Sequence, residues 1–240
     1  MIKKRDFIHQ NIKYSFNWNL KNHKEKLGQL NSNREEFKRL GSYLKKIYQG
    51  SIPNNIFNAK TITRVSQFKV IGLKNGFLRS FSKKLINEGK IQKLDSNSKL
   101  PKFAKKVHEI YYNNQINKNP GHETILKNIL IKDKDSIAIE VPIWSAIKIN
   151  KHITGHIDLI QIEDNVIKII DYKPEGNFLF SLPQVATYGL LLKKLIHIEK
   201  LNCISFNKNS AWEYNPEILL TDVKNLLSSK RIPRIWEDFL

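Results

Sequence analysis

Hydrophobic positions follow a helical spacing in the first part of the chain. Within residues 33–50, side chains such as Phe37, Leu40 and Leu44 recur on one helical stripe that ends near Gly50. Residues 1–100 are therefore expected to be mainly helical. Their other predicted elements are a loop at 51–55, a strand or a helix at 61–70, and a turn at 74–77.

The pattern changes to short β-branched runs alternating with helices in the second part. The predicted order is helices at 102–115 and 121–131, strands at 138–149, 152–163 and 166–173, a helix at 181–196, a strand at 201–206, a candidate strand at 210–215 and a helix at 216–229. A turn is predicted at 164–165, and Pro183 is expected in the first turn of its helix. This order predicts an α/β fold whose antiparallel meander and crossover helix form a mixed sheet.

Charge is unevenly distributed along the chain. Of the net charge of +19, residues 1–100 carry +16, from 22 Lys and Arg against 6 Asp and Glu. The polar, proline-containing stretch at 95–103 suggests a division into a basic part, 1–100, and a core, 101–240. Such a basic segment favours a polyanionic partner, most often nucleic acid. A solvated lysine-rich surface explains the charge equally well, and an anionic membrane surface is a weaker alternative.

Cysteine and hydropathy restrict the remaining classes. Cys203 is the single cysteine, so the chain offers neither a disulfide nor a four-cysteine iron–sulfur site. No apolar run is long enough for a membrane span, and the first residues lack the apolar core of a secretory signal. We expect no membrane association and an intracellular, reducing location, in the cytoplasm or a DNA-containing organelle.

The stretch at 155–175 carries the most chemical information. Asp171 and Lys173 are two apart at the end of an apolar run that predicts a strand buried on both sides, so both point to one face. A hairpin turn at 164–165 brings Asp158, on the preceding strand, close to Asp171. Two close carboxylates repel unless a cation or a proton relieves them, and Mg²⁺ prefers oxygen ligands of this kind. An ordinary ion pair between Asp171 and Lys173 is the competing interpretation.

Three motifs in this region resemble those of the RecB-like branch of the PD-(D/E)xK nuclease superfamily. They are G-H-I-D at 155–158, I-I-D-Y-K at 169–173 and Q-V-A-T-Y at 184–188, in the family's order. The resemblance covers about residues 104–210. It implies a restriction-endonuclease-like core with a central mixed sheet flanked by helices.

The resemblance also implies roles for individual residues. Asp158, Asp171 and the backbone carbonyl of Tyr172 are expected to be metal ligands, and Lys173 the catalytic lysine. Gln184 and Tyr188 lie four apart on the predicted helix and share a face. In the family such residues support the active site or touch DNA. Otherwise, Tyr188 is a core residue and Gln184 a helix-start residue.

The family's first motif, an acidic residue or a histidine on a helix before the first strand, has several candidates here. His122 and Glu123 are adjacent on the predicted helix, so only one of them is expected to face the metal. Glu140, on the first predicted strand, is a third candidate. His108 and Glu109 are less well placed. The sequence leaves this choice open.

The expected function is Mg²⁺-dependent hydrolysis of DNA, with Mn²⁺ able to substitute. The Q-x-x-x-Y motif favours an end-processing, single-strand exonuclease-like enzyme of DNA repair, recombination or replication. A restriction-type or structure-specific endonuclease, an RNA-processing nuclease and a non-catalytic nucleic-acid-binding module are the alternatives. No G-x-x-x-x-G-K-[ST] loop occurs, so no nucleotide cofactor is expected.

Aromatic residues interleave with lysine and arginine in the first part, and single-stranded bases stack on exposed aromatic rings. Most individual aromatic residues are nevertheless expected in the core. The residues concerned are Tyr14, Phe16, Trp18, Phe37, Tyr43, Phe57, Phe68 and Phe77. We hypothesise that this basic part covers the active-site groove and holds the substrate strand.

Overall fold

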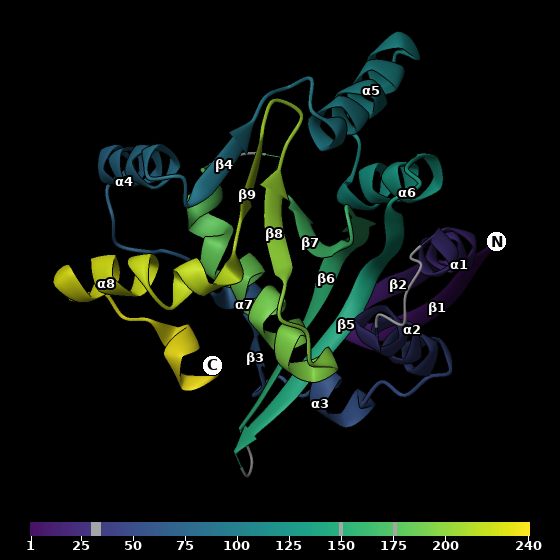
Figure 1. Ribbon diagram of the computed structural model, residues 1–240, viewed down its shortest axis with the longest axis horizontal. Coiled ribbons are helices and arrows are strands. Elements are labelled where there is room, and N and C mark those ends of the chain that lie inside the picture. Colours follow the sequence, from purple (N-terminus) through teal and green to yellow (C-terminus); the bar gives the residue numbers. More distant parts are fainter. Residues whose placement is uncertain (30–34, 149–150, 175–176) are drawn as a thin grey trace.

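A single mixed β-sheet organises the computed structural model, which describes residues 1–29, 35–148, 151–174 and 177–240 (Figure 1). The strands are β1 (Ile2–His9), β2 (Ile12–Asn19), β3 (Thr63–Arg64), β4 (Ile91–Leu94), β5 (Ser136–Lys148), β6 (Lys151–Glu163), β7 (Val166–Tyr172), β8 (Leu201–Phe206) and β9 (Ala211–Tyr214). Among the described residues the sheet runs β1-β2-β5-β6-β7-β8-β9-β4, and β3 pairs with β6 beside this path.

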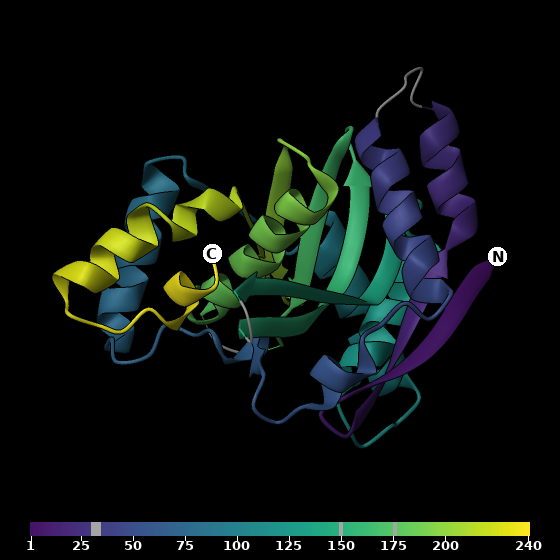
Figure 2. The ribbon, with the colours of Figure 1, turned by 90° about the horizontal axis from the view of Figure 1, so that it is seen from below.

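Helices cover both faces of the sheet. They are α1 (Leu20–Gln29), α2 (Glu35–Tyr48), α3 (Asn54–Asn58), α4 (Asn75–Asn87), α5 (Lys99–Asn113), α6 (His122–Lys132), α7 (Phe178–Ile196) and α8 (Asp222–Ser229), with 3₁₀ turns η1 (Val65–Gln67), η2 (Pro216–Leu219) and η3 (Ile235–Asp238). Helices α5 and α6 pack on one face, against Leu159 and Ile170, and α2 and α7 on the other, against Ile160 and Ile169. Figure 2 shows α1 beside α2 at one end and α4 beside α8 at the other.

The meander and crossover predicted from the sequence are confirmed. Strands β5, β6 and β7 are successive antiparallel neighbours, and α7 connects β7 to the parallel strand β8. Asp164 and Asn165 form the β6–β7 turn with φ of 50° and 62°, a left-handed pair that aspartate and asparagine tolerate well. The chain is therefore an α/β protein with a mixed, open sheet.

The first nineteen residues correct the expectation of a mainly helical first part. They form the β1–β2 hairpin, whose strand β2 joins the central sheet through Asn17 and Trp18 against β5. Strand β1 is an edge strand, and most of its side chains are exposed. An edge strand that buries few side chains and carries many charges lacks the alternation of apolar and polar residues that identifies a strand in a sequence.

The division at 95–103 does not separate the sheet into two parts. Strand β4, from the first part, pairs with β9, from the second, and one apolar core includes side chains from both. Two local expectations are also wrong: residues 74–77 begin helix α4, and α7 begins at Phe178, so Pro183 lies beyond its first turn. Residues 33, 34 and 149, at the ends of two predicted elements, lie outside the described residues.

Most of the aromatic residues of the first part belong to the core, as expected. The buried ones are Phe16, Trp18, Phe37, Tyr43, Phe57 and Phe68. Phe77 is exposed, and Tyr14 is only partly buried. No helix in the described ranges has the combination of length and hydropathy that crossing a membrane requires.

The contact between α7 and β8 generates a first prediction. A Cβ on Gly189 would lie 2.6 Å from Sγ of Cys203 and 3.0 Å from Cβ of Pro216. Gly189→Ala should therefore lower the free energy of unfolding by about 1–3 kcal/mol, measured by urea denaturation. Gly28→Ala is the matched control, because nothing lies within 4 Å of that position in α1 and alanine favours a helix. Equal stability of the two variants would contradict this close packing.

Candidate metal-binding active site

Two buried carboxylates lie side by side just beyond the last paired residues of β6 and β7. Leu159 pairs with Ile170, and the next positions along the two strands are Asp158 and Asp171. Their side chains are 5% and 1% exposed. The backbone N–H of Tyr172 donates to Oδ2 of Asp158 over 2.9 Å. The proximity predicted from the hairpin is therefore present in the structure.

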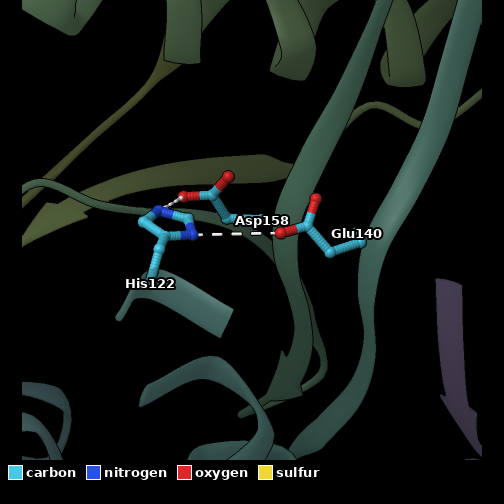
Figure 3. A group of neighbouring side chains, drawn as sticks. All are labelled: His122, Glu140 and Asp158. Atoms are coloured by element: carbon cyan, nitrogen blue, oxygen red, sulfur yellow. Dashed lines mark ion pairs between the residues drawn. The ribbon is translucent and has the colours of Figure 1, made fainter. Parts of the chain in front are cut away.

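The start of helix α6 brings a histidine to Asp158. His122 is the first residue of α6, and its Nε2 lies 2.9 Å from Oδ2 of Asp158 and 3.2 Å from the carbonyl oxygen of Tyr172. Its other ring nitrogen, Nδ1, lies 3.9 Å from Oε1 of Glu140 (Figure 3). The imidazole thus lies between two carboxylates that come from different strands.

Glu140 is held in an unusual backbone conformation. It lies in the middle of β5, between the pairs Ile139–Leu159 and Val141–Ile157, yet its φ is +50°. A non-glycine residue with positive φ inside a strand is uncommon, and such outliers concentrate at functional sites. The Glu140 side chain is 6% exposed, and its Oε2 lies 2.7 Å from Nδ1 of His156.

These side chains form a set that could hold a metal ion. Among the described residues, ligand atoms of His122, Glu140 and Asp158 all lie within 4.8 Å of one another. Neighbouring ligands of an octahedral ion held at about 2.1 Å are about 2.9 Å apart. The spacings from Nε2 of His122 to Asp158 and to the Tyr172 carbonyl match that geometry. Asp171 lies outside this close group, and its Oδ1 has no hydrogen-bond partner in the described ranges.

The carboxylates perturb one another and their neighbours. Burial, and then the Asp158 charge, raise the pKa of Asp171 to about 7. Burial acts to raise the pKa of Asp158 too, but His122 and Lys173 outweigh it and lower that pKa to about 2. Burial also acts to lower the pKa of His122, yet Asp158, Asp171 and Glu140 raise it to about 9. The site thus holds an excess of negative charge that attracts cations.

Lys173 connects the carboxylates to helix α7. Its Nζ lies 2.9 Å from Oδ2 of Asp171 and donates to Oε1 of Gln184 over 3.3 Å. Burial acts to lower the pKa of Lys173, but Asp171 and Asp158 together raise it, so the ammonium stays charged. Nε2 of Gln184 in turn donates to Oη of Tyr188 over 3.5 Å. Gln184 therefore accepts a hydrogen bond from Lys173, and Tyr188 in turn accepts one from Gln184.

Gly155 explains why the G-x-x-D and Q-x-x-x-Y motifs occur together. The Tyr188 ring is buried against β6, and a Cβ on Gly155 would lie 2.5 Å from Cε1 of that ring. Only glycine leaves room for the tyrosine at this distance. The G-x-x-D and Q-x-x-x-Y patterns thus meet in one packing contact.

The other candidates for the acidic or histidine motif do not join this close group, although Glu123 lines the same open pocket. Glu123 is exposed and pairs with Lys127, one turn further along α6, at 2.7 Å. His108 contacts the hydroxyl of Tyr172 at 3.3 Å, and Glu109 is an exposed partner of Lys105. Both His122 and Glu140 approach Asp158, whereas the sequence had left His122, Glu123 and Glu140 as alternatives.

An open pocket of about 670 Å³ joins this cluster to His156 and to residues of the basic first part of the chain. Besides the carboxylates and His122, its lining includes Lys13 and Tyr14 from β2, Arg64 from β3, and His156 from β6. The rings of Tyr14 and His156 are 4.1 Å apart. His156 lies within the G-H-I-D motif. No short-range motif identifies Lys13, Tyr14 and Arg64, because the long-range pairing of β2 and β3 with the sheet places them here.

The contact between Gly155 and Tyr188 is open to a double-mutant cycle. Gly155→Ala should lower the free energy of unfolding by about 1–3 kcal/mol, because the new methyl group overlaps the tyrosine ring. The same substitution in a Tyr188→Leu background should cost less, because leucine has no ring at that place. Urea denaturation of the four proteins measures this coupling. Additive effects would mean that the two positions do not share this packing.

Cation binding is testable without any activity. Mg²⁺ or Mn²⁺ at about 100 times its dissociation constant should raise the free energy of unfolding by about 2.7 kcal/mol. At a fixed ion concentration this stabilisation should grow as the pH rises towards 9, because the raised pKa of His122 makes a proton compete with the ion below that pH. Asp158→Asn should remove it, and Glu25→Gln, which changes an exposed carboxylate on α1, should not. A pH-independent stabilisation shared by Asp158→Asn would place the ion elsewhere.

Comparison with known proteins adds no family assignment. No family model matches the sequence, and neither does any curated protein. The function is therefore argued from the arrangement of the chain's own residues.

Proposed function

We propose that this protein is a metal-dependent deoxyribonuclease built on a restriction-endonuclease-like core. One observation carries the proposal: Asp158, His122 and the Tyr172 carbonyl converge beside the Asp171–Lys173 pair at the edge of an open pocket. The order of these residues along the chain also matches the motifs that resemble RecB-like nucleases. The hydrolase uses Mg²⁺, with Mn²⁺ as a substitute.

Charge balance supports a divalent ion. A bound ion would displace the proton of His122 and keep Asp171 ionised, so that Glu140, Asp158 and Asp171 would bring three buried negative charges into the site and Lys173 one positive charge. The two negative charges that remain are those that one Mg²⁺ neutralises. Burying them without a counter-charge would be costly. The imidazole of His122, the carboxylates of Asp158 and Glu140 and the Tyr172 carbonyl would hold such an ion, and Asp171 would be a further ligand beside them.

The residues around the ion suit phosphodiester hydrolysis. An ion held by these residues would supply a water of lowered pKa and would offset the negative charge that develops on the phosphate. Lys173, held between Asp171 and Gln184, points its ammonium at the same region and can orient that water and contact the phosphate. No serine, threonine or cysteine nucleophile is needed. Cys203 is buried, and burial raises the pKa of its thiol, so it stays inert.

Arg64 is the best candidate for binding the substrate phosphate. Its parallel pairing with Thr154 places it in the pocket wall next to the metal-binding residues. The guanidinium donates to Oη of Tyr14 over 3.2 Å, its Nε is buried without an acceptor, and it has no carboxylate partner within the described chain. A half-buried, unpaired guanidinium is suited to bidentate binding of a phosphate.

DNA with free ends is the proposed substrate, and single-stranded DNA the preferred form. The net charge of +19 favours a polyanion, and residues 13–15, 64 and 66 of the basic first part line the pocket. This agrees with the hypothesis that the basic part holds the strand. The end-processing preference, for repair, recombination or replication, rests on the Q-x-x-x-Y resemblance. RNA and closed circular DNA are the substrates that test it.

Cleavage assays test the proposal directly. End-labelled linear single-stranded DNA, linear duplex, closed circular DNA and RNA are incubated with Mg²⁺ or EDTA. Wild type should cleave the linear DNA only with Mg²⁺. Asp171→Ala and Lys173→Ala should lower the rate by at least about 100-fold while DNA binding persists, because they remove charge stabilisation and water orientation. Glu25→Gln, an exposed change on α1 outside the pocket, is the control that should remain active.

Each outcome of these assays has a distinct meaning. Cutting of the circular DNA would identify an endonuclease, and preferential cutting of RNA an RNA-processing enzyme. Binding without cleavage of any substrate would contradict the proposal and leave a nucleic-acid-binding module. Full activity of Asp171→Ala would show that the site is assigned wrongly.

A separate prediction concerns Arg64. Arg64→Ala should lower kcat/KM on single-stranded DNA by about 10- to 100-fold, because one charged phosphate contact is lost. Arg64→Lys should recover only part of this loss, since lysine does not form the bidentate contact. Lys200→Ala, which removes an exposed cation outside the pocket, should have little effect. If Arg64→Ala and Lys200→Ala behave alike in steady-state kinetics, Arg64 does not bind substrate.

A further inference from the structure

A second pocket of about 650 Å³ lies on the other side of the start of helix α7. Its walls come from α4, the edge strand β4, strand β9 and the first turn of α7. Figure 1 shows α4 lying next to β4 at the edge of the sheet. We refer to this site as the α4–α7 pocket. None of the catalytic candidates lines it.

The α4–α7 pocket is positively charged. Arg79 and Lys83 are four apart on α4 and share a face, and Lys93 faces them from β4. None of the three forms an ion pair with a carboxylate in the described ranges, and no described residue lining the pocket is acidic. By contrast, Lys84, the next residue on α4, lies outside the pocket and pairs with Glu88 at 3.7 Å. Three cations that have no carboxylate partner in the described ranges therefore face one pocket.

Aromatic rings form the floor beside these cations. Phe178 and Trp212 are stacked, with centroids 4.9 Å apart and ring planes 17° apart. Phe180 adds a ring that is 36% exposed. Trp212 is directly opposite Lys93 in the β4–β9 register, so an aromatic surface and a cation are adjacent. Flat rings bordered by cations are the combination that binds unpaired bases and their phosphates.

Helix α7 connects this pocket to the proposed active site. Phe180 lines the α4–α7 pocket and Gln184 lines the active-site pocket. The helical rise puts these two residues about 6 Å apart along the helix axis. One extended strand can therefore contact both pockets around the same end of α7.

We propose that the α4–α7 pocket binds single-stranded nucleic acid a few nucleotides from the scissile phosphate. Arg79, Lys83 and Lys93 contact phosphates, and a base packs on the aromatic floor. A duplex fits less well, because its base faces are already stacked on one another. This inference rests on the proposed nuclease function, which it extends by naming a strand-binding site away from the metal.

Fluorescence anisotropy with a labelled oligothymidylate of about 15 nucleotides, in EDTA to prevent cleavage, tests the inference. The full-length chain is compared with Arg79→Ala/Lys83→Ala, with Trp212→Phe and with the control Lys84→Ala. The double variant should bind at least about tenfold more weakly, and its salt dependence should fall by about 0.7 per lost phosphate contact. Trp212→Phe, which keeps an aromatic ring stacked on that of Phe178, should weaken binding less. Lys84→Ala should bind as wild type does.

The outcomes separate this inference from the proposed function. If the double variant binds as tightly as Lys84→Ala, the α4–α7 pocket does not hold the strand, even if Mg²⁺-dependent cleavage is intact. If the double variant loses affinity but wild type cleaves nothing, strand binding by the α4–α7 pocket is supported and the nuclease proposal fails. An oligouridylate of equal length shows whether the same residues also hold RNA. Failure of wild type to bind either strand overturns the inference.

Discussion

Repulsion between Asp158 and Asp171 is the constraint on which the account of this protein depends. Pairing of β6 with β7 brings the two carboxylates together inside the protein, where water screens neither of them. Burial and the Asp158 charge raise the pKa of Asp171 to about 7. Lys173 offsets part of the negative charge, but Glu140 adds more. The proposed divalent cation would resolve this conflict and would supply the chemistry that hydrolysis of a phosphodiester bond requires.

The surrounding fold is arranged to keep these groups in place. Helix α6 begins at His122, so its first side chain reaches Asp158 and the Tyr172 carbonyl. Helix α7 crosses over from β7 and supports Lys173 through Gln184, and the absence of a side chain on Gly155 lets Tyr188 pack against β6. Parts of the chain that are far apart in sequence therefore meet at one end of the sheet.

The sequence predicted this central part because its signals are local. The apolar run before Asp171 and the Asp164–Asn165 turn predicted the β6–β7 hairpin, and helical periodicity predicted α7. The motifs then placed Asp158 next to Asp171. The choice among His122, Glu123 and Glu140 needed the structure, because it depends on how α6 is rotated and on the positive φ of Glu140.

The first part of the chain was harder to predict for a physical reason. Strand β1 is a charged edge strand that buries little, so it has neither the alternation nor the apolar content of an internal strand. Arg64 reaches the pocket through a two-residue parallel pairing with β6, and Tyr14 through the pairing of β2 with β5. Contacts made across so many residues leave no local pattern. The charge asymmetry favoured a polyanionic partner for this part, which stays a prediction.

The most direct test of the central claim is to locate the cation. Crystals grown with Mn²⁺ would be measured near the manganese absorption edge, and an anomalous difference map calculated. The account predicts a peak within about 2.5 Å of Asp158 and the Tyr172 carbonyl oxygen, next to His122, which disappears in Asp158→Asn. A map with no peak at this cluster, at Mn²⁺ concentrations that support cleavage, would contradict the account.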